Sequence, residues 1–299
     1  MLQRVGGPCD TLSDMVFLML FLLGCMGDRP VAGAALGSGS SRPVWLFELT
    51  ASGWERRPEP VAHSVSSLGL GVVGDTLVLT MQCFWGDCGS ELQRHLVGPP
   101  VHLLWTKDLQ TFHPDMTRLV DPEDRVPIDT EVREPDEVWY YGTAAGVRGD
   151  PAKHADPHVI YKARRVGDRV VEPVEIIRGP GLADPAPLKV AGEQLLFLTT
   201  RPGHAVGLAM GSPMAVNREW TGVSVPHAME VDGEVWLWAQ RVEKGRTFPA
   251  RIRSLDGGKS WGQWDTPLPM DGVDNCGNPV GAVFQGRPVV FCVSEPLHP

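Results

Sequence analysis

The chain has 299 residues, a formal net charge of −9, and 42% hydrophobic and 21% charged residues, the composition of an ordinary soluble globular protein. Its basic residues are scattered along the sequence, which argues against nucleic acid as a partner because such binding needs a clustered basic face. The 34 Gly, 27 Pro and 10 Trp favour a turn-rich all-β protein. No long stretch beyond the N-terminus has helical periodicity.

The N-terminal residues 1–25 form the first predicted unit, a targeting segment. The apolar run Met15–Leu23 is too short to span a bilayer and ends in Leu-Leu-Gly-Cys, with Cys25 last. This ending resembles the lipobox of bacterial lipoproteins. The resemblance implies that Cys25 becomes the lipidated N-terminus and that the protein is extracytoplasmic, held on a bacterial membrane. A plain secretory signal and a buried apolar segment are the alternatives, and Asp10 and Asp14 depart from the basic start of such signals.

Residues 26–43 are rich in Gly, Ser, Ala and Pro, which predicts a flexible tether before a single folded domain at 44–299. With Cys9 removed and Cys25 modified, four cysteines remain, and an exported protein can join them in two disulfides with three possible connectivities. The pairs nearest in sequence are the simplest choice: Cys83–Cys88 and Cys276–Cys292. A zinc site is the weaker alternative because no Cys-x-x-Cys spacing occurs, and we expect neither a metal nor a cofactor.

Strand-like apolar runs recur in units of about 40 to 60 residues, the spacing of a repeat architecture. Within the last full unit, the Asp232-Gly233 turn between two apolar runs is a strong hairpin signal. A further unit near the C-terminus has only two strands. At the other end of the chain, the strand Val44–Leu49, followed by Trp54, belongs to no unit of its own. The predicted strand units are 67–81 with 101–112, 127–143 with 158–163, 184–209, 225–253, and 278–293.

The run Ser254–Gly262 reads Ser-Leu-Asp-Gly-Gly-Lys-Ser-Trp-Gly. Ser and Asp side chains can bind the backbone N–H groups of a tight turn, the glycines permit positive φ, and Trp261 needs burial. The run resembles the Asp-box of sialidases and related β-propellers, found where the third and fourth strands of a blade meet. Thr106–Phe112 is a shortened relative that resembles turns of five-bladed glycosidases.

Together these features predict an all-β fold, a five-bladed β-propeller in which the N-terminal strand closes the last blade. Closure removes exposed sheet edges, and about 50 residues per blade fit the domain length. A pair of β-sandwiches and a six-bladed ring are the alternatives.

In such a ring the starts of the innermost strands face the central funnel. The repeat phasing places five residues at these starts: His63, Asp129, Asp184, His227 and Asp274. A glycoside hydrolase needs one carboxylic acid and one carboxylate, and the resemblance to five-bladed glycosidases implies that they come from these starts. We therefore predict a catalytic set of Asp129, Asp184 and Glu131.

We predict ligand contacts from His63, His227 and Asp274, and from Trp85 on a rim loop, where an aromatic ring suits stacking on a sugar. The alternatives are plain: Asp184 before Pro185 caps a turn, Glu131 is solvated, and Trp85 is simply packed.

Two functional hypotheses follow. The first is an exported, lipid-anchored propeller that hydrolyses or binds glycans through its funnel, as the resemblance implies. The alternative is a non-catalytic surface module, a monomer, that binds a glycan or a protein. A sialidase proper is disfavoured because its Phe/Tyr-Arg-Ile-Pro element is absent and the three tyrosines all lie in apolar strand runs.

Overall fold

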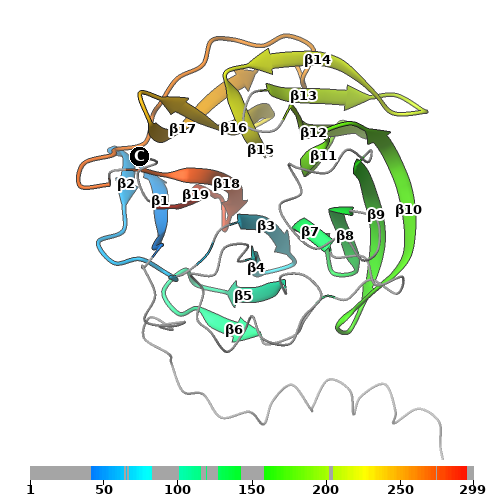
Figure 1. Cartoon of the computed structure of the whole chain (residues 1–299). Coiled ribbons are helices and arrows are strands. Elements are labelled where there is room, and N and C mark those ends of the chain that lie inside the picture. Colours follow the sequence, from blue (N-terminus) through cyan, green and yellow to red (C-terminus); the bar gives the residue numbers. More distant parts are fainter. Residues whose placement is uncertain are drawn as a thin grey trace, which may run out of the picture.

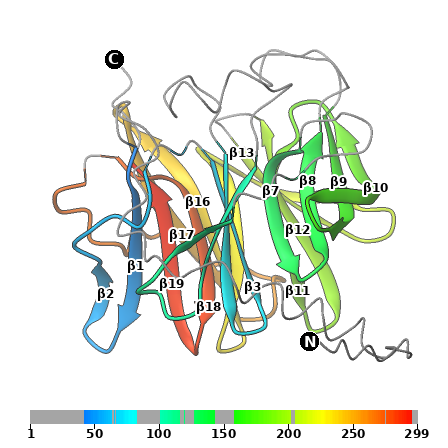
Figure 2. The same ribbon diagram turned by 90° about the horizontal axis from the view of Figure 1, so that it is seen from below.

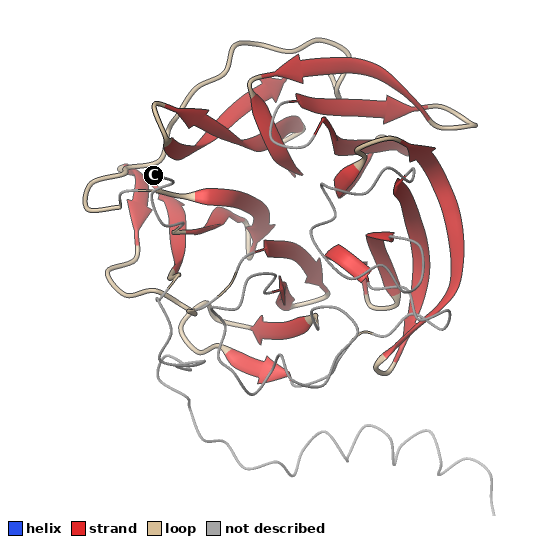
Figure 3. Ribbon diagram, viewed as in Figure 1, coloured by secondary structure: helices blue, strands red, loops and turns tan. Residues whose placement is uncertain are grey.

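A computed structural model describes residues 42–63, 65, 67–82, 101–115, 119, 127–142, 158–201, 205–273 and 275–294. These residues form strands, turns and loops and contain no helix (Figure 3). A search of this part of the chain for helices capable of crossing a membrane finds none.

The strands form five sheets, four with four strands and one with three. They are arranged as blades around a central axis, so the chain is a five-bladed β-propeller, as predicted (Figure 1).

Blade 1 is β3 (Ser67–Val73), β4 (Thr76–Gln82), β5 (His102–Thr106) and β6 (His113–Asp115). Blade 2 is β7 (Pro127–Glu134), β8 (Glu137–Gly142), β9 (His158–Val166) and β10 (Arg169–Gly179). Blade 3 is β11 (Ala183–Val190), β12 (Glu193–Arg201), β13 (Ala205–Met210) and β14 (Ala215–Thr221). Blade 4 is β15 (Val223–Val231), β16 (Glu234–Glu243) and β17 (Arg246–Ser254). Blade 5 is β18 (Gly277–Phe284), β19 (Arg287–Val293), β1 (Val44–Thr50) and β2 (Gly53–Arg56).

The N-terminal strands close the ring within blade 5. Strand β1 pairs antiparallel with β19, in a register that sets Val44 opposite Val293 and Glu48 opposite Val289. The two inner strands of this blade thus come from one end of the described chain and the two outer strands from the other (Figure 1). The predicted closure is confirmed.

The innermost strands β3, β7, β11, β15 and β18 line the axis and run along it (Figure 2). Four of them contain a β-bulge near their start, and each bulge contains a residue at positive φ: Asp129, Asp184, Val225 and Asn278. A bulge adds one residue to a strand and turns its side chains relative to the ladder.

Side chains of the neighbouring blade hold three of these bulges. The bulge N–H groups donate to Gln82 Oε1 (from Asp129, 2.7 Å), Thr199 Oγ1 (from Val225, 3.0 Å) and Gln240 Oε1 (from Asn278, 3.0 Å). In each case the acceptor lies on the second strand of the preceding blade. The blades are therefore joined by polar contacts at the same height as well as by apolar packing.

Strands β3 and β7 approach each other backbone to backbone. A Cβ atom built on Gly71 would lie 1.6 Å from the carbonyl oxygen of Val132, and one on Gly69 would lie 2.1 Å from that of Thr130. Only glycine fits at these two positions.

The turn after β17 has the predicted hydrogen bonds. Ser254 Oγ accepts from the N–H of Gly258 at 2.8 Å, and Asp256 Oδ1 accepts from that of Ser260 at 2.7 Å. Trp261, expected to be buried, is half-buried. It packs edge-to-face on Phe197 and Trp220.

The shorter turn after β5 repeats this pattern. Thr106 Oγ1 accepts from the N–H of Leu109 at 3.0 Å, and Asp108 Oδ1 accepts from the N–H groups of Gln110 and Thr111, both at 2.8 Å. Phe112 then packs against the core shared by blades 1 and 5.

Cys276 and Cys292 form a disulfide, as predicted, between the residue before β18 and strand β19. The other predicted pair, Cys83–Cys88, lies outside the described residues, as do the targeting segment with Cys25 and nearly all of the tether.

Candidate functional site

Asp129 and Asp184 occupy the same position in adjacent blades, the bulge at the start of β7 and β11. We call this end of the inner strands, at the starts of β7 and β11, the channel mouth, and both side chains are half-buried there. Of the predicted site residues, these two are the ones that the structure brings together at the mouth.

The repeat phasing was wrong for His227. The residue of β15 that is equivalent to Asp129 and Asp184 is Val225, and the one in β18 is Asn278. His227 lies two residues beyond the bulge, level with Glu131 of β7. The physical reason is the bulge itself, whose extra residue shifts the phase of each strand.

The carboxyl groups of Asp129 and Asp184 are hydrogen-bonded to each other. Each carboxyl group also accepts a hydrogen bond from a hydroxyl group. Ser67 Oγ donates to Asp129 Oδ1 at 2.5 Å, and Thr199 Oγ1 donates to Asp184 Oδ2 at 2.5 Å. The pair thus connects blades 1, 2 and 3 at the channel mouth.

Both members of the pair hold protons more tightly than ordinary aspartates. Desolvation, followed by repulsion from and hydrogen bonding to Asp184, raises the pKa of Asp129 well above its usual value. Desolvation also raises the pKa of Asp184, but the hydrogen bonds from Asp129 and Thr199 and the attraction of His158 oppose that rise. Two carboxyl groups in contact cannot both ionise easily, so they share one proton.

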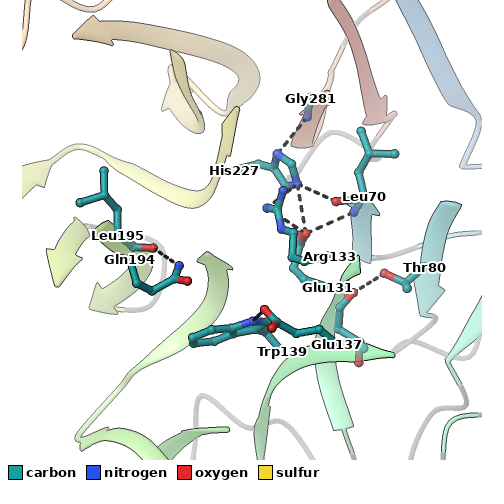
Figure 4. Close-up of polar contacts among 11 residues, drawn as sticks. Leu70, Thr80, Glu131, Arg133, Glu137, Trp139, Gln194, Leu195, His227 and Gly281 are labelled. Carbon is teal, nitrogen blue, oxygen red and sulfur yellow. Dashed lines mark hydrogen bonds and ion pairs between the residues drawn. The ribbon is translucent and has the colours of Figure 1, made fainter. Parts of the chain in front are cut away.

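Further along β7 from Asp129 lies an ionic cluster of the buried Glu131 and His227 with the half-buried Arg133 (Figure 4). Glu131 Oε2 lies 3.1 Å from Arg133 Nη2 and 3.1 Å from His227 Nε2, and it also accepts from the N–H of Leu70 at 3.4 Å. Burial lowers the pKa of Arg133, whereas the charge of Glu131 opposes this shift.

The protonation of His227 follows from its neighbours. The backbone N–H of Gly281 can only donate, and it lies 3.1 Å from Nδ1, so Nδ1 is the acceptor and Nε2 carries the proton of a neutral ring. His227 is fully buried and both of its nitrogens bind protein groups. In this structure it therefore ties blades 4 and 5 to the cluster and presents nothing to the channel mouth.

Glu131 is likewise buried rather than solvated, and its carboxylate points into the cluster (Figure 4). His63 lies between β2 and β3, half-buried, with an Nδ1 that has no hydrogen-bond partner. Asp274 and Trp85 lie outside the described residues. The three tyrosines are all buried, so none of them stands free as a nucleophile.

Sequence reasoning missed the residues that support the pair. Three of them are polar side chains at the ends of apolar strand runs: Ser67, Gln82 and Thr199. Their polar character within apolar runs was the one feature of the sequence that could have indicated them. Arg133 was missed because nothing in the sequence indicates that it is paired inside the channel. Over the residues with described positions, no group of three His, Cys, Asp or Glu is arranged to hold a metal ion.

No protein-family model and no curated protein sequence matches the chain. Solved structures are similar in fold. An exo-β-1,3-galactanase from Phanerochaete chrysosporium with bound galactose has a TM-score of 0.54 and 10% identity, over 77% of this chain and 60% of that chain. An α-L-arabinofuranosidase from Clostridium thermocellum has a TM-score of 0.50 and 12% identity, over 75% of this chain and 80% of that chain.

A sialidase from Trypanosoma rangeli is less similar, with a TM-score of 0.48 and 13% identity over 81% of this chain and 44% of that chain. The first two likenesses show that this propeller has the fold of known glycosidases. The chain spans 60% of the length of the galactanase.

Proposed function

We propose that this protein is a propeller that binds a glycan at the channel mouth, with the Asp129–Asp184 pair as its centre. The observation that carries the proposal is a half-buried pair of adjacent carboxyl groups, both with raised pKa values, that is supported by the hydroxyl groups of Ser67 and Thr199. Carboxylates and carboxylic acids are good partners for sugar hydroxyls, because together they supply donors and acceptors.

The spacing of the pair favours binding over hydrolysis by these two groups alone. Glycosidases that use an acid and a second carboxylate keep them roughly 5 to 10 Å apart, which leaves room for the reacting bond and water. Asp129 and Asp184 are in direct hydrogen-bond contact instead. Glu131, the third predicted catalytic residue, is held in the ionic cluster.

The similar structures support the choice of ligand class. One is named as a galactanase with bound galactose and another as an arabinofuranosidase, so this propeller fold does serve glycan recognition elsewhere. Identities of 10% and 12% carry the fold only, and the ligand of this chain is therefore part of the proposal.

A glycan panel tests the proposal, followed by calorimetric titration of any ligand found. We expect Asp129→Asn and Asp184→Asn each to weaken binding by about tenfold or more, the cost of one charge-assisted hydrogen bond. Asp232→Asn is the matched control, because Asp232 sits in the turn at the far end of β15 and Asn tolerates its positive φ. Equal binding by all variants would refute the site.

Hydrolysis is the second candidate, and the raised pKa of Asp129 favours it. A carboxylic acid whose pKa is raised keeps its proton to higher pH and is suited to protonate a leaving oxygen, provided that another group supplies the base. A screen with aryl glycosides tests this. Activity that disappears in Asp129→Asn but persists in Asp232→Asn would support it, whereas equal activity in both would oppose it.

We further propose that the turn Ser254–Gly262 is an Asp-box and that the protein is exported and lipid-anchored at Cys25. The first proposal is supported by the sequence of the turn and its hydrogen bonds, and the second by the apolar run that ends in Leu-Leu-Gly-Cys. Cys25→Ser should release the protein from the membrane fraction, and its continued retention there would refute lipidation.

A further inference from the structure

A chain of hydrogen bonds with a fixed direction ends on Asp184. The backbone N–H of Val225 lies 3.0 Å from Thr199 Oγ1, and because a backbone N–H can only donate, the hydroxyl oxygen accepts there. The single proton of the Thr199 hydroxyl is then directed to Asp184 Oδ2, 2.5 Å away. Asp184 Oδ2 is thereby required to be an acceptor, and a hydroxyl proton directed to a carboxyl oxygen stabilises its ionised form.

Asp129 has no such constraint. Its Oδ1 accepts from the hydroxyl of Ser67, but among the described residues no N–H group donates to that hydroxyl, so nothing fixes the Ser67 proton on Asp129. The backbone of Asp129 is fixed separately, since its N–H donates to Gln82 Oε1 while Gln82 Nε2 donates to the carbonyl of Pro127. The position of Asp129 is fixed, but its ionisation is not.

The charged groups around the pair act in the same direction. Asp129 faces Asp184 and, further along β7, Glu131, and both raise the pKa of Asp129. Asp184 faces His158, whose Nδ1 donates to the carbonyl of Leu182 at 2.9 Å, and whose attraction lowers the pKa of Asp184. Asp129 is thus surrounded by negative charge, whereas Asp184 has a potential cation beside it.

We propose that Thr199 is a positioning residue that makes the pair asymmetric, so that Asp129 holds the shared proton and Asp184 holds the negative charge. The site then offers one acid hydrogen and one carboxylate, which fits a neutral sugar that both accepts and donates. Acidic sugars are repelled by the charge on Asp184. This consequence for the ligand rests on the proposed function, whereas the asymmetry itself does not.

The asymmetry has a defined pH dependence. Between the pKa of Asp184 and that of Asp129 the pair carries one negative charge and one acid hydrogen. As the pH rises through that pKa, the acid hydrogen is lost and a second negative charge appears. Binding of a neutral sugar is therefore strongest between the two pKa values and declines as the pH rises past the pKa of Asp129 or falls below that of Asp184.

Carboxyl carbon NMR of the free protein, with Asp129→Asn and Asp184→Asn used to assign the signals, tests the proposal. In the wild type we expect Asp184 to ionise first and Asp129 last. Thr199→Val removes the hydroxyl and should bring the two ionisations together or reverse their order, while Thr199→Ser should restore the wild-type order. A purely structural role for Thr199 would change stability without changing this order.

Two results would overturn the proposal: Asp184 ionising after Asp129 in the wild type, or an unchanged order in Thr199→Val. The wild-type order decides the assignment even if Thr199→Val fails to fold. Because the titration needs no ligand, its failure is distinguishable from a failure of glycan binding. For any sugar that binds, we expect its uronic acid counterpart to bind at least tenfold more weakly, and equal binding would contradict the ligand class.

Discussion

Two of the carboxyl groups of strand β7, Asp129 and Glu131, lie two residues apart in opposite environments. Asp129 lies at the bulge, half-exposed at the channel mouth, and shares a proton with Asp184. Glu131 lies beyond the bulge, buried, and is balanced by Arg133. Asp129 is thus partly exposed, whereas Glu131 is enclosed inside the ring.

Glu131→Gln should therefore destabilise the protein strongly. The change removes the carboxylate 3.1 Å from the half-buried guanidinium of Arg133, which costs about 1 to 3 kcal/mol of the free energy of unfolding. Urea denaturation measures the loss. Glu230→Gln, at the exposed end of β15, is the control and should change stability by no more than about 0.5 kcal/mol. Similar stabilities of the two variants would contradict a charge-balanced cluster.

Asp256 should make the stability depend on acidity. Hydrogen bonds from Ser260 and Ser254 lower its pKa to about 2, so its folded-state pKa is below the unfolded value of about 3.9. The stabilisation is then fully present above the unfolded pKa and is lost as the pH falls through about 2. The urea midpoint difference between wild type and Asp256→Asn should shrink over this window. A difference that stays constant down to pH about 2 would exclude this linkage.

At the scale of the element, the inner strands are shaped by bulges and by glycines that allow close approach. The strands β3 and β7 touch through their backbones, which holds the mouth residues Ser67 and Asp129 within hydrogen-bond distance. Packing of these two strands therefore determines the geometry of the site.

Gly71→Ala should disrupt this contact. Its Cβ would lie 1.6 Å from the carbonyl oxygen of Val132, so the strands must separate, at a cost of about 3 kcal/mol. Gly262→Ala is the control, because its Cβ would meet its nearest atom at an ordinary 3.6 Å. Thermal denaturation compares the two variants, and equal melting temperatures would show that β3 and β7 can move apart freely.

The disulfide Cys276–Cys292 should stabilise blade 5. It closes a loop with a sequence separation of 16 residues, for which the loss of unfolded-state entropy is worth about 3 kcal/mol. The double variant Cys276→Ala, Cys292→Ala should lose about that amount in urea denaturation. Unchanged stability in the double variant would mean that the bond contributes little.

The sequence was sufficient to predict the inner three strands of most blades, because those runs are apolar and bounded by turn residues. The strands β10 and β14 were missed, since outer strands are largely exposed and lack a regular apolar pattern. The pair Asp129–Asp184 was predicted from repeat phasing, whereas its direct contact was not. The bulges that bring the two groups together, and that displaced His227, leave no reliable trace in a single sequence.

At the scale of the whole molecule, polar groups meet near the ring axis at two levels of the inner strands. The cluster of Glu131, Arg133 and His227 joins strands of four blades near the axis, through Leu70 of β3 and Gly281 of β18 (Figure 4). The Asp129–Asp184 pair lies at the starts of β7 and β11. The turns at Ser254–Gly262 and Thr106–Phe112 lie on the outer strands and belong to the fold rather than to the site.

The central proposal is glycan recognition at the channel mouth. A crystal structure of the protein with a bound oligosaccharide from the glycan panel tests this proposal most directly. We expect the sugar at the starts of β7 and β11, with hydroxyl groups within hydrogen-bond distance of Asp129 and Asp184. A sugar bound on the outer strands, with the aspartate pair untouched, would contradict the account.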